Sequence, residues 1–419
     1  MTTERQEPLP SGEVPAADPA TDGAPNAYSI KTVWASAVGY ALESFDNFIL
    51  SFSLAAIIAT FSLTETQAGA LATVTVIGAV AGGFVFGILS DYFGRVRVLT
   101  WSILLFAVVT ALTSLVQNYE QFLILRFIAG LGIGGEYGIG MALVSEGWPP
   151  AWRGRATSFV ALGSEAGLLL ALGVSTLVLN FGDWRIIFAI GIFPALFAFW
   201  YRRSVPEPAL FAATKGHRRK FPLRMLFKDA RTTKHSAGII VLTSVQNFGY
   251  YGVIVFLPTY LSKQLGFSIT KTGGWTAATI IGFSLGMVIF GLLSDRIGRK
   301  PTFFVFQVGA IVSLVLYSQL ASPLALLLGG AFMGIFVNGM LGGYGALTAE
   351  LFPTEARGTA QNVLYNIGRG VGSFAPLVIG IVAAHYSFPF ALGTLAIVYV
   401  VDIIATAFLI PETKGVALT

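Results

Sequence analysis

Cysteine is absent from the 419-residue chain, which excludes disulfide bonds and thiol chemistry. The three histidines are scattered along the sequence, so no zinc-ligand cluster is expected either. Charge is also scarce: 11% of the residues are charged, 55% are hydrophobic, and the mean hydropathy is +0.74. A soluble domain of this length cannot hide so much apolar surface, which excludes an ordinary globular protein.

Signatures of enzyme chemistry are missing too. No nucleophile–base pairing or phosphate-binding loop stands out, and the glycine-rich run GLGIGG lies inside an apolar stretch, where it favours close helix packing. We therefore expect no catalytic residue, no metal and no cofactor. The net charge of +5 comes from basic residues in short loops between apolar runs, a pattern that sets membrane orientation and does not predict a nucleic-acid partner.

Long apolar runs are what the sequence does contain. Each has about 20 residues, enough to cross a bilayer as a helix. We predict an all-α membrane protein whose twelve transmembrane helices form two pseudo-symmetric bundles of six. The expected helices are 31–60, 67–90, 96–117, 120–146, 155–180, 184–202, 236–262, 272–294, 301–320, 323–349, 357–384 and 388–410.

The two groups of helices share their loop sequences. GILSDYFGR begins at Gly87 and GLLSDRIGR at Gly291, an offset of 204 residues, and the same offset relates SEGWPPAWRGRA to AELFPTEARGTA. One offset kept across several loops indicates a duplicated unit of about 200 residues, the internal repeat typical of secondary transporters.

Basic residues are distributed asymmetrically. With the N-terminus inside, 21 of the 26 Lys and Arg residues fall on the inner side, which places both termini in the cytoplasm. The chain then divides into a disordered cytoplasmic tail (1–28), a six-helix bundle (29–202), a basic cytoplasmic linker (203–235), a second six-helix bundle (236–410) and a cytoplasmic tail (411–419). We expect a multi-pass protein of the plasma membrane, specifically a bacterial inner membrane, for which a monomer suffices.

The doubled G-x-L-S-D-x-x-G-R loops, the twelve helices in two repeats and the basic linker resemble the major facilitator superfamily over about residues 31–415. LRFIAGLGIGGEYG (125–138) is similar to that superfamily's fourth-helix motif, and PETKG (411–415) to the ending of many sugar and organic-ion carriers. LESFDNF (42–48) is similar to the first helix of its metabolite, sialate and aromatic-acid proton symporters. The resemblance implies uptake of a small organic acid by alternating access, with the proton gradient as the energy source.

Acids within the predicted helices are candidates for proton coupling. Glu43 and Asp46 stand one helical turn apart near the middle of the bilayer, where an ionised carboxylate costs about 2.5–3.5 kcal/mol. Like charges and low dielectric both favour the neutral form of at least one of them. A structural ion pair with Arg126 is the alternative. Glu136, in GGEYG, is a further coupling candidate, and Glu165 a weaker one.

The seventh predicted helix offers neutral polar groups. Gln246, Asn247, Tyr250 and Tyr251 are suited to orienting a polar ligand in a central cavity. Hydrogen bonding between helices is the alternative explanation for each of them.

Two arginines inside predicted helices are candidates for binding the anion. Protonation of Asp46 would release Arg126 for this role. Arg369 lies near the midplane and cannot shed its charge, and its forked guanidinium matches a carboxylate. We therefore predict Arg369 as the main anchor of the substrate carboxylate. An ion pair with an acid of the N-terminal half, across the cavity, is the alternative.

Charged residues repeated in the loops predict a gate. Asp91 and Arg95 of the first loop match Asp295 and Arg299 of the second. We expect their contacts to hold the halves together in the outward-open state and to break on inward opening. A further repeated set is expected to join this network: Glu146, Arg153, Glu350 and Arg357.

Other functions fit these residues less well. Drug–proton antiporters usually carry Gly-Pro in the fifth helix, where this chain reads ALGSEAGLLLALG. PETKG suggests a sugar or polyol symporter, yet two first-helix acids and Arg369 suit an anion that travels with a proton. A non-transporting receptor would not need the gate and the coupling acids. We predict proton symport of an organic anion across the lipid bilayer, with sugar symport and proton-coupled efflux as alternatives.

Overall fold

The computed structural model describes residues 24–180, 182–213, 221–261 and 265–418. Within these ranges twelve helical spans are long and apolar enough to cross a membrane, which confirms the predicted fold class. The N-terminal bundle comprises α1 (Ala27–Phe61), α2 (Glu65–Phe93), α3 (Arg95–Thr113), α4 (Tyr119–Gly147), η1 (Pro150–Trp152), α5 (Arg153–Leu179), α6 (Trp184–Ile190) and α7 (Phe193–Ser204). The C-terminal bundle comprises α10 (Ala230–Thr259), α11 (Ile269–Ile297), α12 (Arg299–Ser318), α13 (Pro323–Gly339), α14 (Leu341–Leu351), α15 (Thr354–Gly372), α16 (Ala375–His385) and α17 (Phe388–Leu409).

Helix ends differ from the sequence-based bounds where local chemistry decides them. Asn26 and Ser29 form a reciprocal capping box, so α1 begins at Ala27 and shortens the expected tail. Residues 1–23 of that tail lie outside the described residues. Proline in the first turn of α7 and α16 restarts the helix, which divides the sixth and eleventh spans in two.

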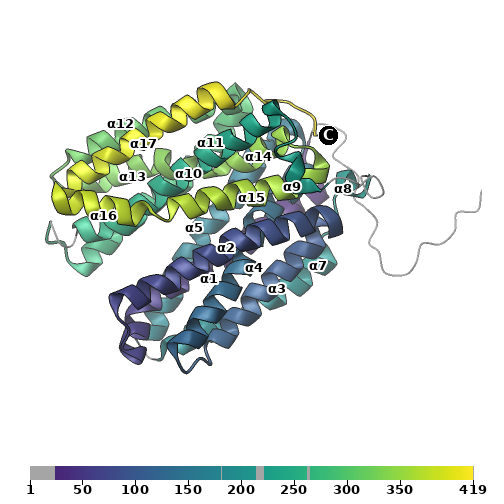
Figure 1. Cartoon of the computed structure of the whole chain (residues 1–419). Coiled ribbons are helices and arrows are strands. Elements are labelled where there is room, and N and C mark those ends of the chain that lie inside the picture. Colours follow the sequence, from purple (N-terminus) through teal and green to yellow (C-terminus); the bar gives the residue numbers. More distant parts are fainter. Residues whose placement is uncertain (1–23, 181, 214–220, 262–264, 419) are drawn as a thin grey trace, which may run out of the picture.

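The expected linker, 203–235, holds two short helices, α8 (Ala209–Ala213) and α9 (Pro222–Met225), and its last residues already belong to α10. Residues 214–220 lie outside the described part of the chain. We call the end of the molecule that carries α8, α9 and the C-terminus the linker face. Figure 1 shows that the two bundles meet at this end and diverge toward the other. The helices in contact between the bundles include α2 with α15 and α5 with α11.

The outer surfaces of both bundles are apolar. Leu115, Leu196 and Phe408 are among the large hydrophobic side chains that are more than half exposed. Buried charged residues lie inside instead, including Glu43, Arg126 and Arg369. This reversal of the soluble pattern requires lipid around the bundles, and the protein is therefore a multi-pass membrane protein.

The sequence repeat has a structural counterpart at the linker face. Gly94 and Gly298 join α2 to α3 and α11 to α12 with φ of 111° and 110°, values that favour glycine. The Glu207 carboxylate accepts from the backbone N–H of Arg95 at 2.8 Å, as the Glu412 carboxylate does from that of Arg299 at 2.9 Å. Glu207 and Glu412 thus cap equivalent helices, α3 and α12.

Candidate functional site

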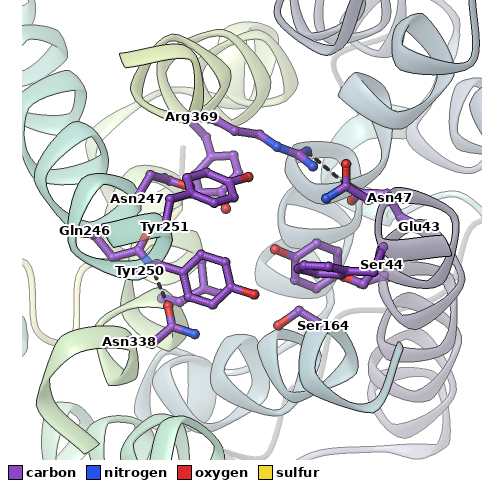
Figure 2. Close-up of a pocket in the computed structure, with 14 residues that line it drawn as sticks. Glu43, Ser44, Asn47, Ser164, Gln246, Asn247, Tyr250, Tyr251, Asn338 and Arg369 are labelled. Atoms are coloured by element: carbon purple, nitrogen blue, oxygen red, sulfur yellow. Dashed lines mark hydrogen bonds and ion pairs between the residues drawn. The ribbon is translucent and has the colours of Figure 1, made fainter. Parts of the chain in front are cut away.

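A polar cavity lies between the two bundles. Its lining includes the predicted residues Glu43, Arg369, Gln246, Asn247, Tyr250 and Tyr251. Figure 2 shows the α10 side chains facing Glu43, Ser44 and Asn47 of α1 across this cavity. The space open to the centres of water molecules is about 30 Å³, room for two or three waters.

One ion pair crosses this cavity. Nη1 of Arg369 on α15 donates to Oε1 of Glu43 on α1 at 2.9 Å, so the pair joins the two bundles (Figure 2). Both side chains are buried, with 7% of Arg369 and 1% of Glu43 exposed. The alternative given for Arg369 in the sequence analysis, an ion pair with an acid of the N-terminal half, is therefore what the structure shows. The carboxylate that this arginine now holds is the protein's own.

Asp46 turns away from Glu43 to a different arginine. Its Oδ2 lies 3.6 Å from Nη1 of Arg126, and Arg126 also donates to Thr110 at 2.8 Å and lies over the Phe188 ring. All these groups belong to the N-terminal bundle. Neither Asp46 nor Arg126 is among the described residues that line the cavity. The structure does not bring Arg126 to the predicted substrate site.

A chain of amides and a carboxylate closes one side of the cavity. Gln246 of α10 donates to Oδ1 of Asn338 on α13 at 2.6 Å, and Asn338 donates to Oε1 of Glu165 on α5 at 3.0 Å. Asn247 donates to the Thr243 carbonyl of its own helix. Gln246 and Asn247, both predicted to orient a ligand, thus make hydrogen bonds within the protein. Those of Gln246 continue through Asn338 to Glu165 and so connect the two bundles.

Glu136 lies on α4 inside the N-terminal bundle and is 1% exposed. Neither of its carboxylate oxygens has a hydrogen-bond partner in the part of the chain that the structure describes. The carboxylate is near enough to Glu43 for electrostatic repulsion. It is therefore connected to the cavity through Glu43, although it does not line the cavity.

The predicted gate residues meet at the linker face. Asp91 at the end of α2 accepts from the backbone N–H of Gly358 and Thr359 on α15 at 3.0 and 2.8 Å. In the other repeat, Asp295 accepts from the N–H of Gly154 and Arg155 on α5 at 2.9 and 3.1 Å. Each aspartate thus crosses from its own bundle to the first turns of a helix in the other, where the helix dipole favours negative charge.

Two glutamates complete these contacts. Glu146 pairs with Arg95 of its own bundle at 2.9 Å and with Arg357 of the other at 3.0 Å. By the same pattern, Glu350 pairs with Arg299 at 2.9 Å and with Arg153 across the interface at 3.0 Å. We call the set defined by these contacts the linker-face network: Asp91, Arg95, Glu146, Arg153, Asp295, Arg299, Glu350 and Arg357. Because both repeats of the network are formed, the bundles are closed together at this end.

Several cavity residues were missed by the sequence reasoning. Tyr40, Asn47, Ser164, Asn338 and Tyr365 all line the cavity. Asn47 and Asn338 are amides within apolar spans, a signal that could have found them. No group of three or more His, Asp or Glu side chains suited to a metal ion occurs among the described residues.

Comparison with known proteins agrees with this architecture. The family model of the Major Facilitator Superfamily matches residues 36–279 and 239–418. A Haemophilus influenzae protein described as a metabolite transport protein is 56% identical over 403 residues, 94% of this chain and 98% of its own. The cis,cis-muconate transport protein of Acinetobacter baylyi is 30% identical over 380 residues, 89% of this chain and 92% of its own.

A solved structure shares the fold. The proton:xylose symporter XylE superposes with a TM-score of 0.79 at 22% identity, over 93% of this chain and 98% of its own.

Proposed function

Because the chain belongs to the major facilitator superfamily and is similar to proteins named as transporters, we propose that it imports a small organic acid together with a proton by alternating access. The observation that carries the proposal is the ion pair between Glu43 and Arg369 across the central cavity. One relative is named for the transport of cis,cis-muconate, which is a dicarboxylate, and this supports an organic anion as the substrate. The structural neighbour supports only the fold.

Charge balance at this pair provides the coupling. Arg369 stays cationic at bilayer depth and needs an anionic partner. With Glu43 ionised, the pair is neutral. When a proton binds Glu43 and a substrate carboxylate takes its place on the guanidinium, the site is neutral again. If a proton binds Glu43 while no substrate is bound, Arg369 is left without a carboxylate partner. Breaking a buried ion pair in this way costs about 3–5 kcal/mol. Empty and doubly loaded sites are therefore favoured over half-loaded ones.

The second acid supplements this exchange. Asp46 Oδ2 and Arg126 Nη1 are 3.6 Å apart, which is longer than a hydrogen bond. A proton on Asp46 loosens this pair and changes the packing of α1 against α4. Asp46 therefore links proton binding to movement of the helix that also carries Glu43.

The linker-face network is the gate that this movement opens. The Lys and Arg residues concentrated in the loops of the linker face support a cytoplasmic location for it, by the positive-inside rule, and the bacterial relatives favour an inner membrane. The structure then corresponds to a transporter closed to the cytoplasm. Rocking of the bundles breaks the network and releases the substrate and the proton inside.

Uptake into proteoliposomes tests this function. The panel comprises cis,cis-muconate, benzoate, lactate, sialate and xylose, each with an inward proton gradient and again after its collapse. We expect one or more acids to accumulate only with the gradient, and Glu43→Gln to abolish accumulation while exchange of the acid at equal pH persists. Gradient-independent uptake of xylose alone would overturn the proposal, and protein-free vesicles control for passive permeation of the acids.

A further inference from the structure

A cluster of buried polar groups lies in the N-terminal bundle beside the cavity. Ser36 of α1, Glu136 of α4 and Tyr201 of α7 are 1%, 1% and 0% exposed. Neither oxygen of Glu136 has a hydrogen-bond partner among the residues that the structure describes. The Ser36 and Tyr201 hydroxyls approach each other but do not form a hydrogen bond of good geometry. A buried polar group that is left unsatisfied in an apolar interior destabilises the fold. Native proteins satisfy such groups with internal water or a shared proton.

Small residues where α1 crosses α4 bring this cluster together. A Cβ on Gly39 of α1 would overlap Oε1 of Glu136, so glycine is what admits the carboxylate to the face of α1. One turn farther on, a Cβ on Gly140 of α4 would lie 3.7 Å from Ser36 Oγ. Tyr201 interacts electrostatically with Glu136, and its hydroxyl points toward that of Ser36. The three side chains thus share one pocket of polar atoms.

The cluster has a neighbour at each end. Toward the cavity, Glu136 is in electrostatic contact with Glu43, the acid of the central ion pair. Toward the linker face, Tyr201 interacts with Tyr28 and Glu207. Tyr28 donates to the Pro206 carbonyl at 3.3 Å. Burial raises the pKa of Glu207, against the backbone N–H groups that lower it.

On the basis of the proposed proton coupling, we propose that Glu136, Ser36 and Tyr201 form a proton path within the N-terminal bundle, from Glu43 to the linker face. Ordered water bridges the polar atoms along the path. The path runs inside one bundle and not between the two, so it gives the proton a route to the linker face separate from the route that the substrate takes when the linker-face network opens.

The step along this path is a proton transfer in which only O–H bonds change. The proton leaves the Glu43 carboxyl and binds the Glu136 carboxylate through water, and Glu136 passes a proton on toward Tyr201 and the linker face. Repulsion between the two carboxylates disfavours ionisation of both, so the proton is shared between them until it leaves. The Glu43 carboxylate then returns to Arg369 and displaces the bound substrate anion. Proton release thereby drives substrate release.

Conservative variants test the path against a purely structural role. Glu136→Gln, Ser36→Ala and Tyr201→Phe each remove a proton-carrying group with little change in volume. Asp402→Asn is the matched control, because Asp402 is also fully buried with two oxygens that have no hydrogen-bond partner among the described residues, but lies in the C-terminal bundle on α17. Initial proton-driven uptake and exchange at equal pH are measured with the panel acid that the wild type accumulates.

The path predicts that Glu136→Gln lowers the initial rate of proton-driven uptake by about 100-fold, the low end for a positioned proton-transfer group. The rate of exchange at equal pH should stay unchanged in Glu136→Gln, and Asp402→Asn should keep the wild-type rates of both uptake and exchange. Tyr201→Phe and Ser36→Ala lower the uptake rate in the same selective way. Proton-driven uptake at the wild-type rate in all three variants would overturn the path. Equal loss of uptake and exchange in all three would also overturn it and assign the cluster a structural role. A wild type that accumulates no acid is a different result, the failure of the proposed function itself.

Discussion

Replacing Glu146 with Gln should open the linker face. The Glu146 carboxylate is fully buried and lies 2.9 Å from Arg95 and 3.0 Å from Arg357, so it joins two guanidinium groups of different bundles. Glutamine keeps the size of the side chain but removes the charge, and the two cations then face each other without this carboxylate. The glutamine amide oxygen can still accept both hydrogen bonds. Hydrogen bonds with a charged acceptor contribute about 1.5–3 kcal/mol each and those with a neutral acceptor about 0.5–1.5 kcal/mol, so each of the two bonds loses about 1–1.5 kcal/mol. We expect the closed state to lose about 2–3 kcal/mol, a change of roughly 30- to 150-fold in the closed-to-open ratio.

The absence of cysteine makes this shift easy to measure. Spin labels on Arg97→Cys and Arg296→Cys, both exposed and on different bundles at the linker face, report the distance between the bundles by pulsed electron resonance. A second, longer distance should gain population in Glu146→Gln. Asp183→Asn is the control, because the Asp183–Arg185 pair is solvent-exposed and such pairs contribute little. Identical distance distributions in Glu146→Gln and the control would refute the assignment of this network as a gate.

Two further changes test the gate and the anchor. Gly358→Ala should also shift the labelled pair toward the longer distance, because a Cβ on Gly358 would overlap Ser90 Oγ of the other bundle. Gly173→Ala is the control, because a Cβ there meets no neighbouring atom within 4 Å. Equal distance distributions in the two variants would contradict the close approach of α15 to α2 at Gly358. Arg369→Lys keeps the charge beside Glu43 but loses the fork, so the KM for the transported acid should rise by about 10- to 100-fold with a smaller change in kcat, and a KM within about twofold of wild type would exclude Arg369 as the anchor.

The membrane architecture follows from the sequence because lipid imposes strong constraints. Every backbone polar group of a span must be satisfied internally, so apolar runs of sufficient length have to be helices. The 204-residue repeat predicted which loops would be equivalent, and Gly94 and Gly298, which keep this offset, indeed join equivalent pairs of helices with the same backbone conformation. What the sequence did not predict is the break at Met340, where α13 and α14 meet without a proline.

The partners of the buried charges could not be read from the sequence. Glu43 and Arg369 are 326 residues apart, and their contact depends on how the bundles approach each other. Sequence spacing favoured one shared environment for Glu43 and Asp46, but the structure directs them to different arginines. Arg126 was predicted to bind an anion because the sequence indicates only its depth in the membrane and not its neighbours. Its actual surroundings, Asp46, Thr110 and Phe188, are set by packing within one bundle.

The central claim is that one organic acid and one proton cross together through the exchange at Glu43 and Arg369. Proteoliposomes loaded with a pH-sensitive dye, with no pH gradient imposed, test it most directly when cis,cis-muconate and the other panel acids are added outside. We predict that entry of the transported acid acidifies the lumen, that acidification saturates with acid concentration, and that it disappears in Glu43→Gln. Entry of the acid at the wild-type rate without any acidification beyond that of protein-free vesicles would contradict the mechanism.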